Sequence, residues 1–498
     1  MAASERDPGR DGRDVRADDA DGRHIRAVGG EGAAFAGRRV LVAGAGISGL
    51  AAARVLLDEG ASVWVSDDDP ARLAGLPGGA VATGDGIPDG TELIVTSPGR
   101  RPDHPLVADA AARGVEVIGE PELAWRLGSR RPDPPAWLVV TGTNGKTTTT
   151  EMLAAILHAA GADAVACGNI GFPVVSAVAD GHRALAVELS SFQLHWSPSV
   201  RPAAGVVLNV AEDHLDWHGG MGGYAAAKAA ALAGDVAVAG VDDPVAARLL
   251  DASPAARRVG VTLGEPGPGQ LGVSGGDLVD RAFGGGALLA AAAVVPPGPP
   301  GVTDALAAAA LARAYGIAPE TVGAALASFA PGPHRSVPVG DVGGVRWVDD
   351  SKATNPHAAD AALDAVGART PGARAVWVVG GLLKGVSADA LGALARRHAP
   401  GLAGVVVIGT DRGPILDALA RHTPEVPVRE VVPGDDDGMP SDPMPEAVRL
   451  AAGLAAPGDV VLLAPAAASM DQFHDYAHRG RAFAEAVAHL AVTAGGTR

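Results

Sequence analysis

The chain has 498 residues, of which 47% are apolar and 19% are charged, so we expect a globular protein with more than one domain. A formal net charge of −17 argues against binding to nucleic acid or to anionic membranes, and any phosphate site must be a local positive pocket. The single cysteine, Cys167, excludes an internal disulfide, and no export signal or membrane-spanning apolar run is evident, so we expect a cytoplasmic protein without membrane insertion.

The first ordered segment carries a glycine-rich turn. Residues 1–36 mix Asp, Arg and Gly with almost no apolar content, so we expect a disordered tail there. Beyond it, Arg39–Gly49 predicts a strand followed by the turn Gly44-x-Gly46-x-x-Gly49, and Val63–Asp67 predicts the next strand. Taken alone, this pattern favours a Rossmann-type dinucleotide site with Asp67 on a ribose hydroxyl. Another nucleotide, or close strand–helix packing without a ligand, stays open.

Two more strands are predicted at Glu92–Thr96 and Val115–Ile118. The turn Thr96–Gly99 follows the first of them, at the carboxyl end of a strand, where open α/β sheets bind ligands. The composition of Leu127–Pro135 is that of a linker.

A second phosphate-type turn follows this linker. Trp137–Thr150 reads Trp-Leu-Val-Val-Thr-Gly-Thr-Asn-Gly-Lys-Thr-Thr-Thr-Thr, which predicts an apolar strand, a turn of small residues and a helix. The N-terminus of such a helix attracts anions, Lys146 adds a positive charge, and a hydroxyl after the lysine can bind Mg²⁺. The general P-loop pattern requires glycine at Val140, so the motif is incomplete, and a glycine-rich turn with a solvated lysine is the alternative.

Polar side chains follow the next predicted strands. Glu188 ends an apolar strand where P-loop enzymes hold a Mg²⁺-binding acid, although a solvated glutamate is an equal alternative. Five more polar residues crowd the end of the following strand: Asn209, Glu212, Asp213, His214 and Asp216. This group suits a hard cation, although a lone histidine is more often structural. By pattern alone Lys228, in the predicted helix Tyr224–Ala233, is a surface lysine.

A third α/β pattern is predicted to begin at Val345. Before it, Pro296–Gly301 predicts a stiff loop, and Asp304–Tyr315 predicts an Ala-rich helix. Four strands are predicted at Val345–Asp349, Ala375–Gly380, Val405–Gly409 and Val460–Leu463. Lysines and hydroxyls lie in the turns after three of them, which suggests a site for a small carboxylate.

Taken in order, these motifs resemble those of the Mur ligases, the ATP-dependent amino-acid-adding enzymes of bacterial peptidoglycan synthesis. The resemblance covers about residues 38 to 490 and rests on nine segments: Gly44–Gly49, Ser97–Gly99, Thr141–Thr148, Gly168–Gly171, Glu188–Gln193, Glu212–Asp216, His334–Arg335, Asp350–Asn355 and Ser469–Phe473. Each motif is weak alone, but the ordered set is specific. Three of them, Glu-Leu-Ser-Ser-Phe-Gln, Asp-Ser-Lys-Ala-Thr-Asn and Ser-Met-Asp-Gln-Phe, resemble those of the D-glutamate-adding members.

The resemblance implies an α/β protein with three domains. A Rossmann-like N-terminal domain at 37–132 would bind the UDP end of the substrate rather than NAD. A central P-loop-type ATPase domain at 133–332 would bind ATP. A Rossmann-like C-terminal domain at 333–498 would bind the amino acid.

The resemblance also implies the role of individual residues. The UDP substrate would contact Ser48, Asp67, Ser97, Gly99, Asn169, Ser190 and Gln193. ATP would contact Gly142, Thr143, Asn144, Gly145, Lys146, Thr147, Thr148, His334, Arg335 and Asp350, with Asp349 as the alternative to the last. Two Mg²⁺ ions would be held by Thr147, Glu188, His214 and Lys228, the lysine as a carbamate. Catalysis would rest on Lys146, Glu188, His214 and Lys228. D-glutamate would contact Lys352, Thr354, Lys384, Ser469 and Tyr476.

The implied reaction joins D-glutamate to UDP-N-acetylmuramoyl-L-alanine through an acyl phosphate, in a monomer. The chain departs from the family pattern at Pro300–Asp304, which replaces His-Asn-x-x-Asn, at Ala464, which replaces a serine, and at Tyr476, which replaces a phenylalanine. The alternatives are a sibling ligase for another amino acid, a dinucleotide oxidoreductase and a non-catalytic nucleotide-binding paralogue.

Overall fold

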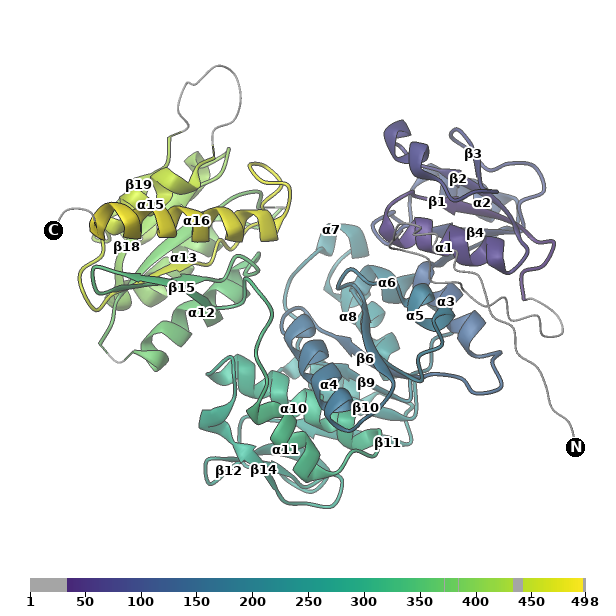
Figure 1. Ribbon diagram of the computed structural model, residues 1–498, viewed down its shortest axis with the longest axis horizontal. Coiled ribbons are helices and arrows are strands. Elements are labelled where there is room, and N and C mark those ends of the chain that lie inside the picture. The colour runs from purple at the N-terminus through teal and green to yellow at the C-terminus, as the bar shows by residue number, and fades with distance from the viewer. Residues whose placement is uncertain (1–33, 371, 384, 433–441, 496–498) are drawn as a thin grey trace, which may run out of the picture.

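The chain folds into three α/β units, each built on its own sheet (Figure 1). The structure is a computed structural model, and it describes residues 34–370, 372–383, 385–432 and 442–495. In Figure 1 the N-terminal unit lies at the right, the central unit in the middle and the C-terminal unit at the left.

The first unit is a parallel five-stranded sheet flanked by helices. Its strands, in sheet order, are β3 (Val81–Ala82), β2 (Ser62–Ser66), β1 (Arg39–Ala43), β4 (Leu93–Thr96) and β5 (Glu116–Gly119). Its helices are α1 (Ile47–Asp58), α2 (Pro105–Ala112) and α3 (Glu120–Gly128). Strand order reverses between β1 and β4, so the turns after these two strands meet at one edge, the usual ligand position of such sheets. The backbone N–H of Ser97 donates to Ala43 O at 3.0 Å there.

The central unit has a nine-stranded sheet. In sheet order its strands are β14 (Ala287–Ala290), β13 (Asp277–Asp280), β12 (Gln270–Ser274), β11 (Arg257–Val261), β10 (Val236–Gly240), β9 (Ala204–Val207), β6 (Ala136–Thr141), β8 (Ala184–Glu188) and β7 (Ala164–Gly168). Its helices are α4 (Lys146–Ala159), α5 (Val174–Ala179), α6 (Ser191–His195), α7 (Leu215–His218), α8 (Met221–Ala229), α9 (Pro244–Asp251), α10 (Pro299–Ala314) and α11 (Pro319–Ala327). Because β6 lies between β8 and β9, the ends of these three strands bring the phosphate-type turn, Glu188 and Asn209 to one edge.

The third unit has a six-stranded sheet. In sheet order its strands are β15 (Val337–Val342), β16 (Val345–Asp349), β20 (Val460–Leu463), β17 (Ala375–Gly380), β18 (Leu402–Ile408) and β19 (Val428–Glu430). Its helices are α12 (Pro356–Arg369), α13 (Ala388–His398), α14 (Gly413–His422), α15 (Met444–Ala452) and α16 (Tyr476–Gly495). The parallel strands β17, β18 and β20 are buried along their whole length, which agrees with their continuous apolar sequences.

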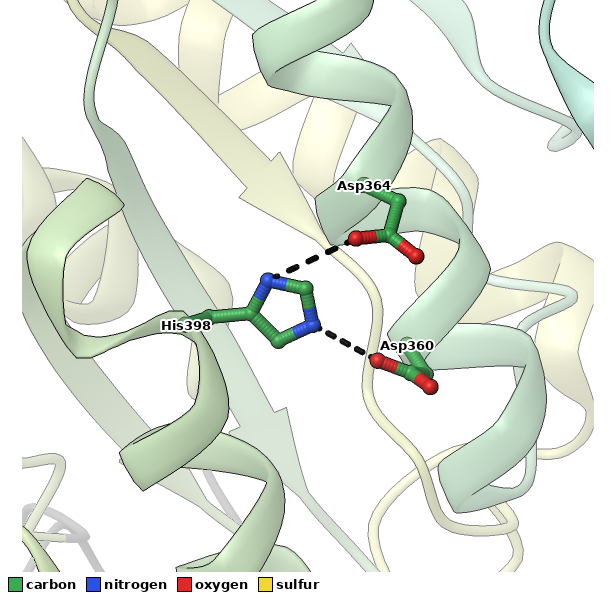
Figure 2. A group of neighbouring side chains, drawn as sticks. All are labelled: Asp360, Asp364 and His398. Carbon is green, nitrogen blue, oxygen red and sulfur yellow. Dashed lines mark hydrogen bonds and ion pairs between the residues drawn. The ribbon is translucent and has the colours of Figure 1, made fainter.

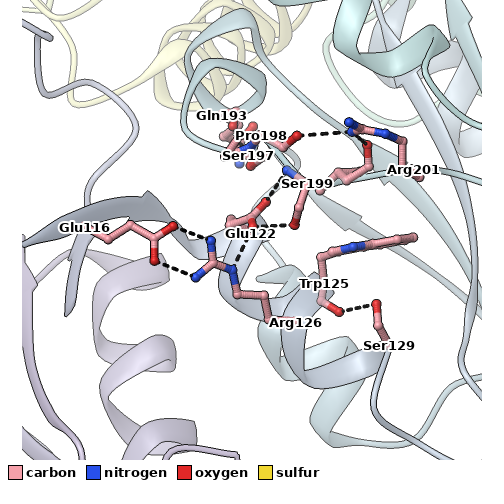
Figure 3. A network of polar contacts seen from close by, with 11 residues as sticks. Glu116, Glu122, Trp125, Arg126, Ser129, Gln193, Ser197, Pro198, Ser199 and Arg201 are labelled. Carbon is pink, nitrogen blue, oxygen red and sulfur yellow. Dashed lines mark hydrogen bonds and ion pairs between the residues drawn. The ribbon is translucent and has the colours of Figure 1, made fainter. Parts of the chain in front are cut away.

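A polar network fastens the first unit to the central one (Figure 3). The fully buried carboxylate of Glu122, on α3, accepts the backbone N–H of Ser199 at 3.0 Å and the Nε of Arg126 at 2.8 Å. The two terminal nitrogens of Arg126 donate to Glu116 at 2.8 and 2.6 Å. The Arg126 guanidinium thus offsets the charge of the buried Glu122 carboxylate inside the junction, which lowers the free-energy cost of burying that carboxylate.

Two expectations from the sequence are wrong in detail. Helix α10 begins at Pro299 rather than at Asp304, because proline fits the first helical turn, where its missing N–H has no partner to lose. The third sheet begins at β15 rather than at Val345, with β15 antiparallel to β16. Among the described residues, none of the helices is long and apolar enough to cross a membrane.

Candidate active site

An asparagine that follows the neighbouring strand fixes the backbone of the phosphate-type turn. Asn209 Oδ1 accepts the backbone N–H groups of Thr143 and Asn144 at 3.1 and 2.9 Å, and Asn209 Nδ2 donates to Asn144 O at 3.2 Å. The sequence grouped Asn209 with cation ligands, but its amide is engaged with the turn. Gly145 caps α4 with a φ of 84°, and a Cβ there would lie 2.2 Å from Asp304 Oδ1, so only glycine fits.

Two lysines share one backbone carbonyl in this turn. Lys146 Nζ donates to the carbonyls of Gly142 and Thr143 at 3.0 and 2.9 Å, and Lys228 Nζ donates to the same Gly142 oxygen at 2.7 Å. Lys228 is only 1% exposed, so its interpretation as a surface lysine is wrong. Burial, followed by the charge of Lys146, lowers the pKa of Lys228 well below its usual value.

Glu188 offers an oxygen without a partner. The side chain is 1% exposed; Oε1 accepts Asn169 Nδ2 at 2.8 Å, and Oε2 is buried without a hydrogen-bond partner. A buried carboxylate oxygen with no donor is costly unless a cation pairs with it. Thr147 follows Lys146 on α4, and His214 precedes α7 in the left-handed region with its ring 4.7 Å from that of Phe192. Glu188 therefore fits the predicted Mg²⁺ site.

A second group with metal-ligand chemistry lies in the third unit (Figure 2). His398 Nε2 is 2.6 Å from Asp360, and its Nδ1 is 3.9 Å from Asp364. The two ring nitrogens therefore face different carboxylates. Arg397 pairs with both carboxylates. We interpret this group as an ion-pair network that joins α12 to the end of α13, separate from the predicted magnesium site.

Residues of the third unit reach the phosphate turn. Arg335 donates to Thr148 Oγ1 at 3.3 Å and lies 3.8 Å from Glu151. Burial lowers the pKa of Lys146, and the charges of Lys352 and Arg335 act in the same direction. Lys146, Lys352 and Arg335 thus form a cluster of cations at the phosphate turn. This cluster is the local positive pocket expected of a chain with a net charge of −17.

His334 and the adjacent acids hold the link between the second and third units. His334 Nδ1 is 2.6 Å from Asp349 Oδ2, and Asp350 Oδ1 accepts the backbone N–H of Ser336 at 3.1 Å. Burial raises the pKa of Asp350 to about 6. Which of the two acids would contact ATP stays a prediction.

Four of the five residues predicted to bind D-glutamate lie at one end of the third sheet. Lys352 Nζ lies 3.9 Å from the centre of the Tyr476 ring, and Ser469 is 3% exposed in the turn after β20. Thr354 donates its backbone N–H to Lys352 O at 2.9 Å. Lys384 lies outside the described residues.

Arg479 is a residue of this region that the sequence analysis missed. It is 1% exposed, and its guanidinium donates to Ser351 O, Ser351 Oγ and Ala467 O at 2.9, 3.0 and 3.1 Å. It joins the turn that carries Lys352 to the turn that carries Ser469. An arginine inside a helix has no local sequence signal for such a role.

Several residues predicted to bind the UDP substrate are engaged with the protein. Asp67 accepts the backbone N–H of Ala45 at 2.7 Å and of Asp69 at 2.9 Å, so it braces the glycine turn, and its ribose contact stays a prediction. Ser190 and Gln193 cap α6 reciprocally. At the same junction the Trp217 indole donates to Gly99 O at 3.2 Å. Ser97 lies beside Gly44, and Ser48 lies in the first turn of α1.

A cavity of about 430 Å³ lies beside Arg335, between the central and third units. Its walls are mainly apolar and include Pro296, Pro297, Val337, Val348, Ala362 and Leu462.

Asp304 is a buried acid below the phosphate turn. It is 7% exposed, Thr149 Oγ1 donates to its Oδ1 at 3.2 Å, and burial raises the pKa of its carboxyl group to about 8. The folded protein therefore keeps a proton that the unfolded chain loses near pH 4. The contribution of Asp304 to the free energy of unfolding is therefore most favourable below about pH 4. It falls as the pH rises from about 4 to about 8, and it stays low above about pH 8.

Replacing Asp304 with asparagine should therefore stabilise the protein at neutral pH. We expect the unfolding temperature of Asp304→Asn to exceed that of the wild type by several degrees at pH 8, and by much less at pH 5. Calorimetric scans at both pH values measure this, with the exposed Asp251→Asn as control. An equal shift at the two pH values would contradict a neutral Asp304 in the folded protein.

The known proteins to which this chain is similar are Mur ligases. Three Mur ligase families match: the MurD-like N-terminal domain over residues 38–119, the middle domain over 140–269 and the glutamate ligase domain over 334–467. The UDP-N-acetylmuramoylalanine–D-glutamate ligases of Mycolicibacterium smegmatis and Rhodococcus jostii are each 53% identical to this chain, over 91% of it and 96% of their own length.

Solved structures agree in fold. MurF ligase from Thermotoga maritima in complex with ADP has a TM-score of 0.56 at 18% identity, with 94% of this chain and 97% of that chain covered. MurC from the same organism has a TM-score of 0.55 at 19% identity, with 91% and 99% covered. The family resemblance drawn from the motifs is confirmed: the chain belongs to the Mur ligase family.

Proposed function

We propose that this chain is the ATP-dependent ligase that adds D-glutamate to UDP-N-acetylmuramoyl-L-alanine, with formation of ADP and phosphate. The relatives at 53% identity carry that name over nearly the whole chain. The observation that carries the chemistry is the phosphate turn, where Lys146 and Lys228 converge on Gly142 O, beside Glu188 with an unpaired oxygen. The match of residues 38–119 to the MurD-like N-terminal family favours UDP over a dinucleotide in the first unit.

ATP and D-glutamate would contact different residues of the site. Backbone N–H groups of the turn and Lys146 would hold the ATP phosphates, with Arg335 from the third-unit side. The apolar cavity beside Arg335 is the place we propose for the adenine base. Lys352, Thr354, Ser469 and Tyr476, with Lys384, would hold D-glutamate.

The reaction needs a better electrophile than a carboxylate. ATP would phosphorylate the alanyl carboxylate, and the amine of D-glutamate would then displace phosphate from the acyl phosphate. When bound between Thr147, Glu188, His214 and Lys228, Mg²⁺ would offset negative charge on the phosphate oxygens. Lys146 would stabilise the charge that accumulates during transfer, and the third unit would exclude the water that hydrolyses acyl phosphates.

Lys228 would act as a carbamate. A primary amine must be neutral to react with CO₂, and the burial of Lys228 beside Lys146 favours its neutral form. The amine donates to the neutral carbonyl of Gly142 at 2.7 Å. Addition of CO₂ converts the neutral amine into a carbamate anion and releases one proton, and this anion would attract the ammonium group of Lys146.

We propose the cytoplasm as the place of reaction, since ATP is available there, and a monomer as the working unit, since one chain supplies all of the proposed ligand residues. The experiment measures phosphate release with ATP, Mg²⁺ and UDP-N-acetylmuramoyl-L-alanine, with and without D-glutamate. We expect release that needs both substrates, with L-glutamate inert. Release with another amino acid would indicate a sibling ligase, and ATP binding without release would indicate a non-catalytic paralogue.

A further inference from the structure

A side-chain contact joins the third unit directly to the phosphate turn. Asn355 Nδ2 donates to Asn144 Oδ1 at 3.0 Å, across the junction between the two units. We propose that Asn355 is a positioning residue that docks the amino-acid-binding segment on the phosphate turn through Asn144. This inference rests on the proposed function, because it concerns the delivery of D-glutamate to the acyl phosphate.

Both ends of this contact are fixed by other bonds. Asn355 is the N-cap of α12, and its Oδ1 accepts the backbone N–H of Ala358 at 2.9 Å. The oxygen is therefore occupied, and the amide nitrogen is the group that faces Asn144. Asn209 holds the backbone of Asn144 on both sides. Three asparagines thus link the central sheet to a helix of the third unit, through the backbone of Asn144 on one side and its side chain on the other.

Asn355 lies in the same short segment as residues proposed to bind D-glutamate, so its contact affects where they lie. It ends the segment Asp350–Asn355, which also carries Lys352 and Thr354, two of the residues proposed for D-glutamate. Anchoring the last residue of this short segment sets the distance of those side chains from Lys146 and Glu188. Misplacement of a reacting group by a small distance is costly for a reaction between two bound substrates.

The chemistry of the pair suits its location. Both partners are neutral amides, so their bond does not compete for the cations that ATP needs. A carboxylate at either position would add a negative charge beside the phosphate turn, and at position 355 it would also face the acceptor Oδ1 of Asn144. The contact thus positions the third unit without changing the charge of the pocket.

Two substitutions separate docking from helix capping. Asn355→Ser and Asn355→Asp both keep an oxygen that can cap α12, but serine is too short to reach Asn144 and aspartate lacks the donor. We expect kcat to fall about tenfold in both variants, while the unfolding temperature stays near the wild-type value. The Kd for ATP should stay near the wild-type value in Asn355→Ser and rise in Asn355→Asp, because aspartate adds a negative charge beside the phosphate turn. Ser387→Ala is the matched control, because Ser387 caps α13.

The pairing itself is tested by a double-mutant cycle. If Asn355 acts through Asn144, Asn144→Ala/Asn355→Ser loses no more kcat than Asn144→Ala alone. Strictly additive losses would overturn the inference, as would kcat values within twofold of the wild type in both Asn355 variants.

A readout without turnover separates this inference from the proposed function. Hydrogen exchange of segments 142–148 and 350–355 should be faster in Asn355→Ser than in the wild type or in Ser387→Ala. Equal exchange rates in all three proteins would overturn the inference even if the wild type is an active ligase. Faster exchange in Asn355→Ser, together with a wild type that releases no phosphate, would support the contact and reject the reaction.

Discussion

Lys228→Ala is expected to lower kcat by about a thousandfold or more, because it removes a buried group from the centre of the phosphate site. The amine lies 2.7 Å from Gly142 O, is 1% exposed and shares that carbonyl with Lys146. If Lys228 serves as a carbamate, the loss is that of an anionic metal ligand rather than of a cation. Steady-state phosphate release at saturating substrates measures the effect.

Chemical rescue distinguishes the carbamate from an ammonium group. Short carboxylic acids are expected to restore part of the activity of Lys228→Ala, because they can fill the vacated space with the same charged group, whereas short alkylamines should not. Lys228→Arg should be as impaired as the alanine variant, since arginine stays protonated and does not take up CO₂. Near-normal activity in the arginine variant would refute the carbamate role.

Arg479→Ala is expected to cost about 3 kcal/mol of the free energy of unfolding, because it leaves two buried carbonyl groups without donors. Burial lowers the pKa of Arg479 to about 10, so the side chain is still charged at neutral pH and the substitution removes a charged guanidinium. The two turns that it joins carry Lys352 and Ser469, so we also expect the KM for D-glutamate to rise more than the KM for ATP. Thermal unfolding and initial rates measure the two effects.

Arg481→Ala is the matched control, because Arg481 lies on the same helix and is exposed. Arg479→Lys should be intermediate in stability, since one ammonium group cannot reach all three acceptors. If Arg479→Ala unfolds at the temperature of Arg481→Ala, the guanidinium does not hold the two turns together.

The sequence alone determined the order of the motifs, and with it the family and the three α/β units. Strands β16, β17 and β20 coincide with the predicted ranges. Strands β17 and β20 are buried along their whole length, and such parallel strands are continuous apolar runs. Lysine use is also informative: the chain has only four, Lys146, Lys228, Lys352 and Lys384, and all four lie at predicted site positions. Arginine stays charged and carries a wide planar head, so it does not replace a lysine that must fit a narrow site or lose its proton.

Only the tertiary structure decided what each polar side chain touches. Lys228 has the pattern of a surface lysine, and it is buried because α8 packs its side chain against the turn before α4. Asn209 was grouped with cation ligands, and it holds the phosphate turn because β9 lies beside β6 in the sheet. Arg479 and Asn355 have partners more than a hundred residues away in the chain. Local sequence encodes backbone conformation and burial periodicity, whereas a hydrogen-bond partner, an unpaired oxygen or a shifted pKa depends on which distant segments the fold brings together.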